Sequence, residues 1–317
     1  MRLWDDELEE ARPTIRAESR EFVDRMLAGE TRPSSADARI KAQRAAESAW
    51  VIRSDRASDR TIEGPAGPLR LREFRPANAD AAMLHIHGGG WVSGEPEMTD
   101  LLNEALSELL NIAIVSVDYR LAPENPYPAG PDDCEAAALW LIERTTTEYG
   151  TDRLLIGGES AGAHLAAVTL LRLRDHHGLA GRFCGANLVF GAYDLSGPPS
   201  ASGIGLQPGN DILDPEGMLF MVEQFAPETA AYDRRDPDMS PLYADLSGMP
   251  RVLFTIGTED HLVDDTLFFA SRWVLAGNDA ELLVYPDAPH GCIGVPTVMN
   301  HWWPRLQEFL RSCLQAI

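Results

Sequence analysis

The chain has 317 residues, of which 44% are hydrophobic and 24% are charged. This composition is typical of a globular protein with a large buried core, and it excludes a disordered chain. The 49 acidic residues outnumber the 27 basic ones, which gives a formal net charge of −22. Because this charge repels polyanions, we expect neither nucleic acid nor an anionic membrane surface as a partner.

No apolar run in the sequence approaches the roughly 18 residues that a membrane span requires. The acidic start MRLWDDELEE lacks the basic region that opens a signal peptide. The sequence therefore predicts a cytoplasmic protein without stable membrane association. The four cysteines are widely scattered, with no C-x-x-C pair, and are expected to be free thiols.

The chain opens with a segment of helical composition. Residues 5–57 are rich in Ala, Arg and Glu, and a break near Gly29 and Pro33 divides them into two or three predicted helices. Residues 61–78 follow as two short extended runs around a Gly-Pro-Ala-Gly-Pro turn, which predicts an opening hairpin.

Beyond the hairpin, apolar runs of strand length alternate with amphipathic segments. This alternation is typical of βαβ units, which build a parallel sheet with helices on both faces. The strand candidates are residues 81–87, 112–119, 153–158, 186–192, 251–257 and 281–286. The helix candidates are residues 97–110, 132–148, a helix opening at Ser160, 264–276 and 301–315. About eight strands are expected in total.

The stretch from Asp194 to Met249 interrupts this alternation. It begins with Ser, Gly and Pro, contains an amphipathic run near residues 213–226, and holds no strand candidate. We expect an insertion over one edge of the sheet. A chain of this length is then one α/β catalytic domain with a small accessory element.

The strongest motif is Gly158-Glu159-Ser160-Ala161-Gly162, which joins an apolar strand candidate to an Ala/Leu-rich helix. A tight strand-to-helix turn exposes a serine hydroxyl as a nucleophile above the sheet. The two glycines suit the strained turn and the close approach of helix and strand. The positive end of the helix also favours negative charge at this point. Ser160 is therefore the candidate nucleophile.

A second motif, His87-Gly88-Gly89-Gly90-Trp91, follows the strand candidate 81–87 directly. Its glycines expose backbone N–H groups, which together with the N–H of Ala161 can surround the oxyanion of a tetrahedral intermediate. Two of Gly88, Gly89 and Gly90 suffice, and the motif alone leaves the choice open. A phosphate-binding loop is disfavoured because the spacing G-x-G-x-x-G and a lysine are both missing.

A nucleophilic serine needs a base and a residue that orients the base, and both follow in the expected order. Asp260 comes just after the strand candidate 251–257, and His290 comes just after 281–286. Both then lie at the carboxyl ends of strands, where ligands bind. His261 is an alternative base, and Glu259, Asp264 and Asp265 are alternative acids; the two aspartates are expected to open the next helix.

Three further residues have open roles. Glu159 either tunes the site or makes a buried structural hydrogen bond, and Trp91 either lines the substrate pocket or packs. His85 and His87 point to the same face of their strand, as metal ligands do. However, no H-E-x-x-H motif or carboxylate cluster completes a metal site, and none is expected.

Taken together, five segments resemble the bacterial hormone-sensitive-lipase-like esterases, which have the α/β-hydrolase fold. The resemblance covers about residues 70–317. The segments are HGGGW, SVDYRLAPENPYPAGPDDC, GGESAGAHLAA, GTEDHLVDD and the late PHG. The sequence departs from the family pattern in three places: Glu159 precedes the serine, His261 follows the acid, and Cys292 follows the His-Gly pair.

The resemblance implies the roles that these positions play. It assigns the oxyanion hole to Gly89 and Gly90, and it implies a helical cap made of residues 1–55 and an insertion near 195–245, over a catalytic domain of residues 56–317. It also implies short acyl chains, a small-molecule ester as substrate and no cofactor.

The sequence thus predicts a serine carboxylesterase in which Ser160, His290 and Asp260 form a triad. The same triad also serves amidases, lactonases and deacetylases. A ligand receptor on this fold is the other alternative, although such a protein is expected to lack a triad member. The edge strand 281–286 makes a homodimer plausible.

Overall fold

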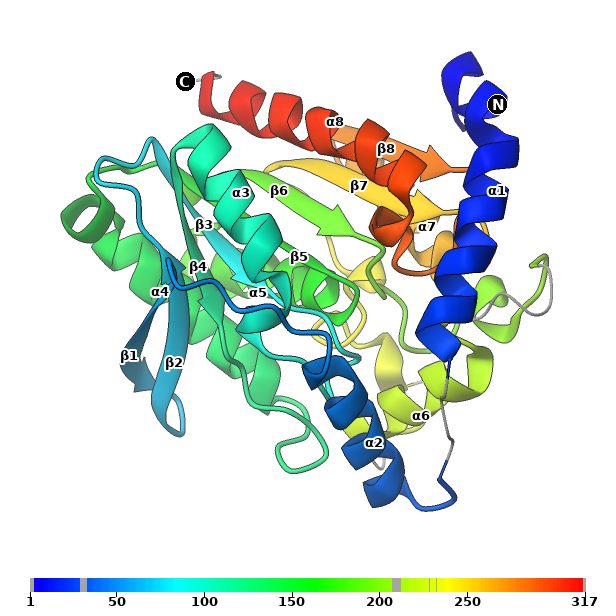
Figure 1. Cartoon of the computed structure of the whole chain (residues 1–317). Coiled ribbons are helices and arrows are strands. Elements are labelled where there is room, and N and C mark those ends of the chain that lie inside the picture. The colour runs from blue at the N-terminus through cyan, green and yellow to red at the C-terminus, as the bar shows by residue number, and fades with distance from the viewer. Residues whose placement is uncertain (1–2, 29–32, 207–211, 228, 232, 316–317) are drawn as a thin grey trace.

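A computed structural model of the chain describes residues 3–28, 33–206, 212–227, 229–231 and 233–315. Its centre is one eight-stranded sheet in the order β1-β2-β4-β3-β5-β6-β7-β8 (Figure 1). The strands are β1 (Ser58–Gly64), β2 (Gly67–Phe74), β3 (Ala81–Ile86), β4 (Ile112–Val117), β5 (Leu154–Glu159), β6 (Phe183–Val189), β7 (Arg251–Gly257) and β8 (Ala280–Tyr285).

The sheet is mixed and mostly parallel. β1 and β2 form the predicted hairpin, and β2 runs antiparallel to β4, whereas every pair from β4 through β8 is parallel. The central strands are buried on both faces. Their sequences are therefore continuous apolar runs and do not alternate between apolar and polar residues. The predicted α/β-hydrolase architecture of about eight strands is therefore confirmed.

Helices cover both faces of the sheet. On one face lie α3 (Asp100–Leu110) and α8 (Pro296–Gln315), and on the other lie α4 (Ala129–Tyr149) and α5 (Ala161–His177), as Figure 1 shows. α7 (Val263–Leu275) packs against β7 and β8. Two helices begin earlier than expected, α4 at Ala129 and α8 at Pro296. In both, proline occupies the first turn, where its missing N–H costs no hydrogen bond.

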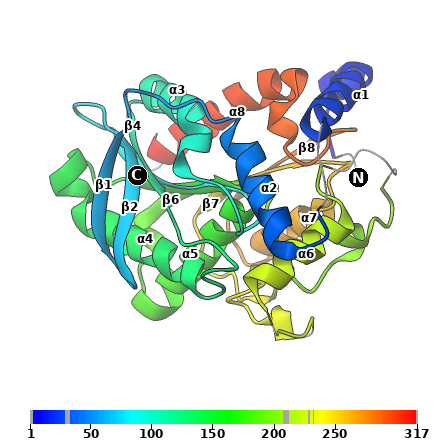
Figure 2. The same cartoon turned by 60° about the horizontal axis from the view of Figure 1, so that its bottom comes forward.

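Three more helices lie beyond the carboxyl ends of the central strands. They are α1 (Asp6–Leu27), α2 (Ala36–Ser48) and, within the predicted insertion, α6 (Pro215–Phe225). Figure 2 shows α2 and α6 side by side, where Arg39 Nη1 lies 3.2 Å from Glu216 Oε1. The helical segment ends at Ser48, earlier than the predicted 57, and Gly29 of the predicted break lies outside the described residues. The described residues between 194 and 249 form no strand.

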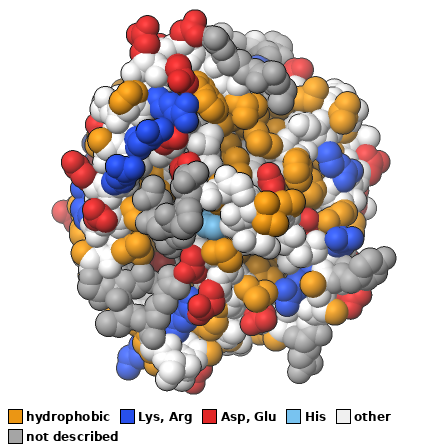
Figure 3. Space-filling view, turned by 90° about the vertical axis from the view of Figure 1, so that its right-hand side faces the viewer, with side chains coloured by type: hydrophobic (Ala, Val, Ile, Leu, Met, Phe, Trp, Pro, Cys, Tyr) orange, Lys and Arg blue, Asp and Glu red, His pale blue; other side chains and the backbone are white. Residues whose placement is uncertain are grey.

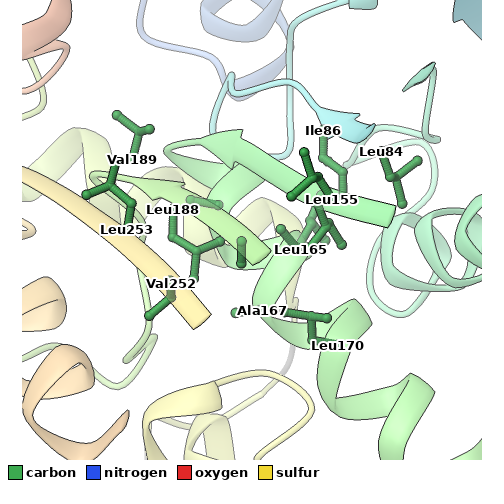
Figure 4. Close-up of a cluster of buried hydrophobic side chains, with 14 of the residues drawn as sticks. Leu84, Ile86, Leu155, Leu165, Ala167, Leu170, Leu188, Val189, Val252 and Leu253 are labelled. Carbon is green, nitrogen blue, oxygen red and sulfur yellow. The ribbon is translucent and has the colours of Figure 1, made fainter. Parts of the chain in front are cut away.

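The core sits between the sheet and α5. Leu165 of α5, Leu188 of β6 and Val252 of β7 meet there and are fully buried (Figure 4). Each such side chain contributes about 1.5–3 kcal/mol through burial. Every residue of α5 from Ala161 to Leu173 is buried, so the helix that follows Ser160 is enclosed on all sides. This enclosure fixes the position of the turn that precedes it.

Candidate active site

Ser160 lies in the tight turn between β5 and α5. Its backbone adopts φ 55° and ψ −120°, a conformation that costs a non-glycine residue roughly 1–3 kcal/mol. The flanking glycines are required by close packing: a Cβ on Gly158 would stand 2.3 Å from the carbonyl oxygen of Ile86, and one on Gly162 would stand 1.9 Å from it. The turn therefore presses against the end of β3 and exposes the serine side chain.

The structure brings Ser160, His290 and Asp260 together, although they lie on three different loops. The Ser160 hydroxyl oxygen is 3.0 Å from His290 Nε2, and His290 Nδ1 is 2.9 Å from Asp260 Oδ2. Asp260 is fully buried, whereas the His290 side chain remains 13% exposed. This chain of contacts has the geometry of a nucleophile, a base and an orienting acid.

The loops that carry Asp260 and His290 are joined to each other. The N–H of Thr258 donates to the carbonyl of Tyr285, the N–H of Glu259 donates to the carbonyl of Ala288, and the N–H of Asp287 donates to the hydroxyl of Thr258. Within its own loop, Asp260 accepts the N–H of Leu262 through Oδ1. Its second oxygen is thereby directed at the histidine.

The alternative base and acid are engaged elsewhere. His261 is buried, and its Nδ1 lies 2.9 Å from the carbonyl oxygen of Ser200. Asp264 and Asp265 lie in the first turn of α7, as expected, but Asp265 is buried and accepts the N–H groups of Tyr193 and Asp194. Burial raises the pKa of Asp265 well above its usual value. We conclude that it has a structural role.

The glycine loop passes close to the serine. A Cβ on Gly88 would come 3.5 Å from Ser160 Cβ, and Gly89 and Gly90 have φ of 113° and 59°, a region that favours glycine. Among the described residues, no hydrogen bond is donated by the N–H of Gly89, Gly90 or Ala161. Ala161 is the first residue of α5, so its N–H has no partner within the helix. These donors are available to a ligand.

His87 holds the start of this loop. Its ring stacks on Tyr119 at 4.3 Å between centroids, and its Nδ1 lies 2.8 Å from the carbonyl oxygen of Gly88. Because that oxygen is an acceptor, Nδ1 carries the proton and donates it. Burial lowers the pKa of His87 to about 4, so the ring is neutral near pH 7.

Trp91, the last residue of the glycine motif, packs against α5 and α6. Its indole N–H donates to His164 Nδ1 at 3.0 Å, and its ring stacks on Phe225 of α6 at 4.9 Å. His164 Nε2 in turn donates to the carbonyl of Met239. Burial lowers the pKa of His164 to about 4. These contacts favour the packing interpretation of Trp91.

Glu159 forms a buried hydrogen-bond chain beside the serine. Its Oε2 lies 3.1 Å from His85 Nε2, and His85 Nδ1 lies 2.9 Å from the hydroxyl of Ser116. The second interpretation of Glu159, a structural hydrogen bond, is the one that these contacts favour. Both rings of the His85 and His87 pair are thus used in protein contacts.

One group in the described part of the chain has the spacing of metal ligands: Glu135 of α4 with His176 and His177, which end α5 remote from Ser160. Glu135 Oε1 already contacts both histidines, at 3.2 and 2.9 Å, and its Oε2 lies 3.2 Å from the guanidinium of Arg172. A fixed positive charge at this distance disfavours a second cation. The four cysteines are free thiols, as predicted.

Three sets of contacts around the site carry no sequence motif. Arg12 and Arg16 of α1 bind Asp287, three residues before His290, at 2.8 and 3.0 Å. Arg44 of α2 donates to the carbonyls of Val92 and Ala122 beside the glycine loop. Met221 of α6 lies over Gly90, where an added Cβ would stand 1.9 Å from its sulfur. These residues join segments far apart in the chain, so no local pattern marks them.

The chain is similar to a known family and to several characterised proteins. A family model described as the alpha/beta hydrolase fold matches residues 83–294. The chain is 31% identical to the carboxylic ester hydrolase LipN of Mycobacterium tuberculosis over 75% of its own length, and it covers 64% of LipN. It is 30% identical to the ethyl acetate hydrolase of Pseudomonas putida, with 76% of each chain covered.

Among solved structures, a hormone-sensitive lipase from a metagenome library superposes with a TM-score of 0.75 at 26% identity, covering 94% of this chain and 97% of that one. The chain belongs to the hormone-sensitive-lipase-like carboxylesterases of the α/β-hydrolase fold. The family resemblance predicted from the motifs is therefore confirmed.

In members of this fold, ligands bind at the carboxyl ends of the strands. Figure 3 views this side of the protein, toward which β6, β7 and β8 point in Figure 1. Hydrophobic side chains gather in the upper part of this face, and a histidine surface is exposed near its middle. In the described part of the chain, no helix is long and apolar enough to cross a membrane.

Proposed function

We propose that this protein is a serine carboxylesterase that hydrolyses short-chain carboxylic esters through an acyl-enzyme intermediate. The observation that carries the proposal is the continuous hydrogen-bonded chain from Ser160 through His290 to the buried Asp260. Such a chain activates a hydroxyl that is otherwise a weak nucleophile.

The reaction follows from these positions. His290 Nε2 takes the proton of Ser160 while the serine oxygen forms a bond to the ester carbonyl carbon. Asp260 holds the ring and stabilises the imidazolium that results. His290 then gives the proton to the leaving alcohol as the carbon–oxygen bond breaks. Water attacks the acyl-enzyme by the same route, with its proton passing to His290 and then to Ser160, and the acid is released.

The negative charge on the carbonyl oxygen is received by backbone donors. We assign the oxyanion hole to the N–H groups of Gly89, Gly90 and Ala161, because all three are without a partner in the described structure and the glycine loop adjoins Ser160. The N-terminal end of α5 adds a favourable dipole at the same point. Metal and cofactor have no part in this scheme.

The proposed preference for short acyl chains depends on the segments that cover the site. We infer that α1, α2 and the insertion near 195–245 act as a cap, because Met221 of α6 lies directly over Gly90. This side chain limits the room beside the oxyanion hole. The similarity to a protein named for ethyl acetate hydrolysis supports a small ester as substrate.

The test is hydrolysis of p-nitrophenyl acetate, butyrate, octanoate and laurate by the wild type and by Ser160→Ala. We expect turnover of the two short esters and a loss of at least about 10³-fold in kcat in the variant, because the nucleophile is removed. A matched amide, p-nitroacetanilide, serves as the comparison for amidase activity.

Each outcome distinguishes one alternative. Turnover of octanoate and laurate above acetate contradicts the short-chain proposal alone. Amide turnover equal to that of the matched ester favours an amidase. A folded wild type that is inert on every ester contradicts esterase activity and leaves ligand binding on the same fold as the alternative.

A further inference from the structure

The Gly89–Gly90 peptide is planar, and its two polar groups point in opposite directions. The carbonyl belongs to Gly89 and the N–H belongs to Gly90, and in a trans peptide they stand anti to each other. Whatever fixes the Gly89 carbonyl therefore also fixes the direction of the Gly90 N–H. That N–H is one of the assigned oxyanion donors.

Three groups converge on the Gly89 carbonyl oxygen. The N–H groups of Val92 and Ser93 donate to it at 3.2 and 3.0 Å, and the Ser93 hydroxyl lies 2.8 Å from it. Ser93 is fully buried, and an added Cβ on Gly89 would stand 2.2 Å from the Ser93 carbonyl oxygen. The serine and the glycine are therefore packed so closely that no side chain fits on Gly89.

Helix α2 reaches the same hydroxyl from outside the loop. The Ser93 Oγ lies 2.9 Å from Glu47 Oε1 and accepts a hydrogen bond from Gln43 Nε2 at 2.8 Å. Glu47 Oε2 is buried and has no hydrogen-bond partner in the described structure. Arg44, on the same helix, donates to a carbonyl further along the loop, that of Val92. Gln43, Arg44 and Glu47 of α2 therefore all make hydrogen bonds to this loop.

A hydroxyl has one proton, and Ser93 has two acceptors for it. If the proton goes to the Glu47 carboxylate, the Gly89 carbonyl loses one of its three donors. If it goes to Gly89, the peptide is held more firmly, and its N–H becomes a better donor because hydrogen bonds in a chain polarise one another. Glu47 therefore competes with the oxyanion loop for the Ser93 proton.

We propose that Ser93 is a positioning residue for ester hydrolysis, which fixes the Gly90 N–H through the Gly89 carbonyl, and that Glu47 of α2 competes for its proton. The inference rests on the proposed esterase function. It gives helix α2 a direct connection to the proposed oxyanion hole, besides its proposed part in covering the site.

The experiment compares Ser93→Ala, Ser93→Cys and Glu47→Gln with the wild type and with the control Ser48→Ala, an exposed serine on α2. Cysteine keeps most of the side-chain volume but donates only weakly. A glutamine at position 47 keeps the shape of the side chain, but its amide is a weaker acceptor than a carboxylate. The readouts are kcat and KM for p-nitrophenyl butyrate, the inhibition constant of a trifluoromethyl ketone, and the melting temperature.

We expect both Ser93 variants to lose about 3- to 30-fold in kcat, less than the roughly 10²–10³-fold cost of deleting an oxyanion donor, because two N–H donors still hold Gly89. KM should change by less than about twofold, since the peptide acts mainly in the transition state. The inhibition constant of the ketone, whose adduct with Ser160 carries an oxyanion, should rise by the same factor as kcat falls. Glu47→Gln should keep or raise kcat.

A merely structural role for this cluster makes a different prediction, in which the Ser93 and Glu47 variants lose activity together and in proportion to their melting temperatures. That parallel loss, or wild-type kcat and inhibition in Ser93→Cys, overturns the inference. If Ser93→Ala does not fold, the contrast between Ser93→Cys and Glu47→Gln decides. A wild type inert on all esters removes the proposed function itself, whereas Ser93 variants with the kcat of an active wild type contradict only the positioning role.

Discussion

The floor and the cover of this site differ in how much of their attachment depends on exposed charges. The floor consists of the loops that follow β5, β7 and β8, and these loops carry Ser160, Asp260 and His290. Buried strands and a fully enclosed helix fix them from below, and backbone hydrogen bonds join the last two loops. The cover consists of α1, α2 and α6, which are attached both by buried apolar side chains, such as Ile15 and Phe225, and by charged side chains at the surface.

The exposed ion pairs of the cover are weaker than its buried contacts and than the core. Glu216, which binds Arg39 between α2 and α6, is 77% exposed, and Glu124, which binds Arg44 of α2, is 58% exposed. Such surface ion pairs contribute roughly 0–1 kcal/mol each, whereas one fully buried leucine contributes about 1.5–3 kcal/mol. The exposed ion pairs of the cover therefore contribute less to stability than the buried side chains beneath the floor.

Asp260→Asn should have the largest effect and should act on the floor alone. Asparagine keeps the size of the side chain, but it presents an uncharged amide to His290 Nδ1 and no longer stabilises the imidazolium. We expect kcat for p-nitrophenyl butyrate to fall by about 10³–10⁴-fold with little change in KM, the loss typical of an orienting aspartate. Steady-state kinetics near pH 7.5 measure it.

The control is Asp279→Asn, which makes the same chemical change at an aspartate whose side chain is 83% exposed. It should leave kcat within about twofold of the wild type, since surface changes away from the site are usually mild. A loss of less than tenfold in Asp260→Asn would mean that His290 is oriented by another group.

A substitution at His164 tests the contact between α5 and the residues that pack over it. It lies on α5, accepts the Trp91 indole N–H, and donates to the carbonyl of Met239. Burial lowers its pKa from 6.5 to about 4, so between these values the unfolded chain binds a proton that the folded protein excludes. Stability is therefore present above pH 6.5 and is lost as the pH falls toward 4, by about 2–3 kcal/mol from this residue at pH 4.5.

His164→Gln should reduce this loss, because glutamine can make both hydrogen bonds and does not titrate. Urea unfolding at pH 7.5 and pH 4.5 gives the two free energies, and their difference should shrink by about 2–3 kcal/mol in the variant. His87 is buried with its pKa lowered to about 4 by the same cause, so part of the wild-type loss remains. An unchanged difference would show that His164 is already protonated or exposed in the folded state.

The same division explains what the sequence predicts well. The strands, the Ser160 turn and the glycine loop are local patterns, and Asp260 and His290 could be placed because parallel strands end at one edge of a sheet. The resemblance also implies a cap, which stays a prediction. The attachments of the cover are different, since the pairing of Arg12 with Asp287 depends on how α1 docks across the sheet. No spacing in either segment predicts which of the many surface charges will meet.

We expect the smallest effect at the ion pairs between α1 and Asp287. These ion pairs are also the most direct test of how strongly the cover is attached. Asp287 binds Arg12 and Arg16, and it has φ 56°, a conformation that asparagine tolerates well. Burial raises the pKa of Asp287, but the hydrogen bonds from Arg12 and Arg16 lower it by a larger amount. The pKa of Asp287 is therefore below its usual value. The stability that the charge supplies is present above pH 3.8 and is lost as the pH falls below it.

Asp287→Asn should therefore cost only about 1 kcal/mol near pH 7, because both arginines are more than one-third exposed. The cost should shrink in 1 M NaCl, where surface charges are screened. Asp287→Ala is the matched comparison: it removes the same charge and adds about 1 kcal/mol of backbone strain, which salt does not affect. Urea unfolding at low and high salt separates the two contributions. A cost for Asp287→Asn that is large and independent of salt would show that α1 is part of the floor, and the division between floor and cover would then move to α2 and α6.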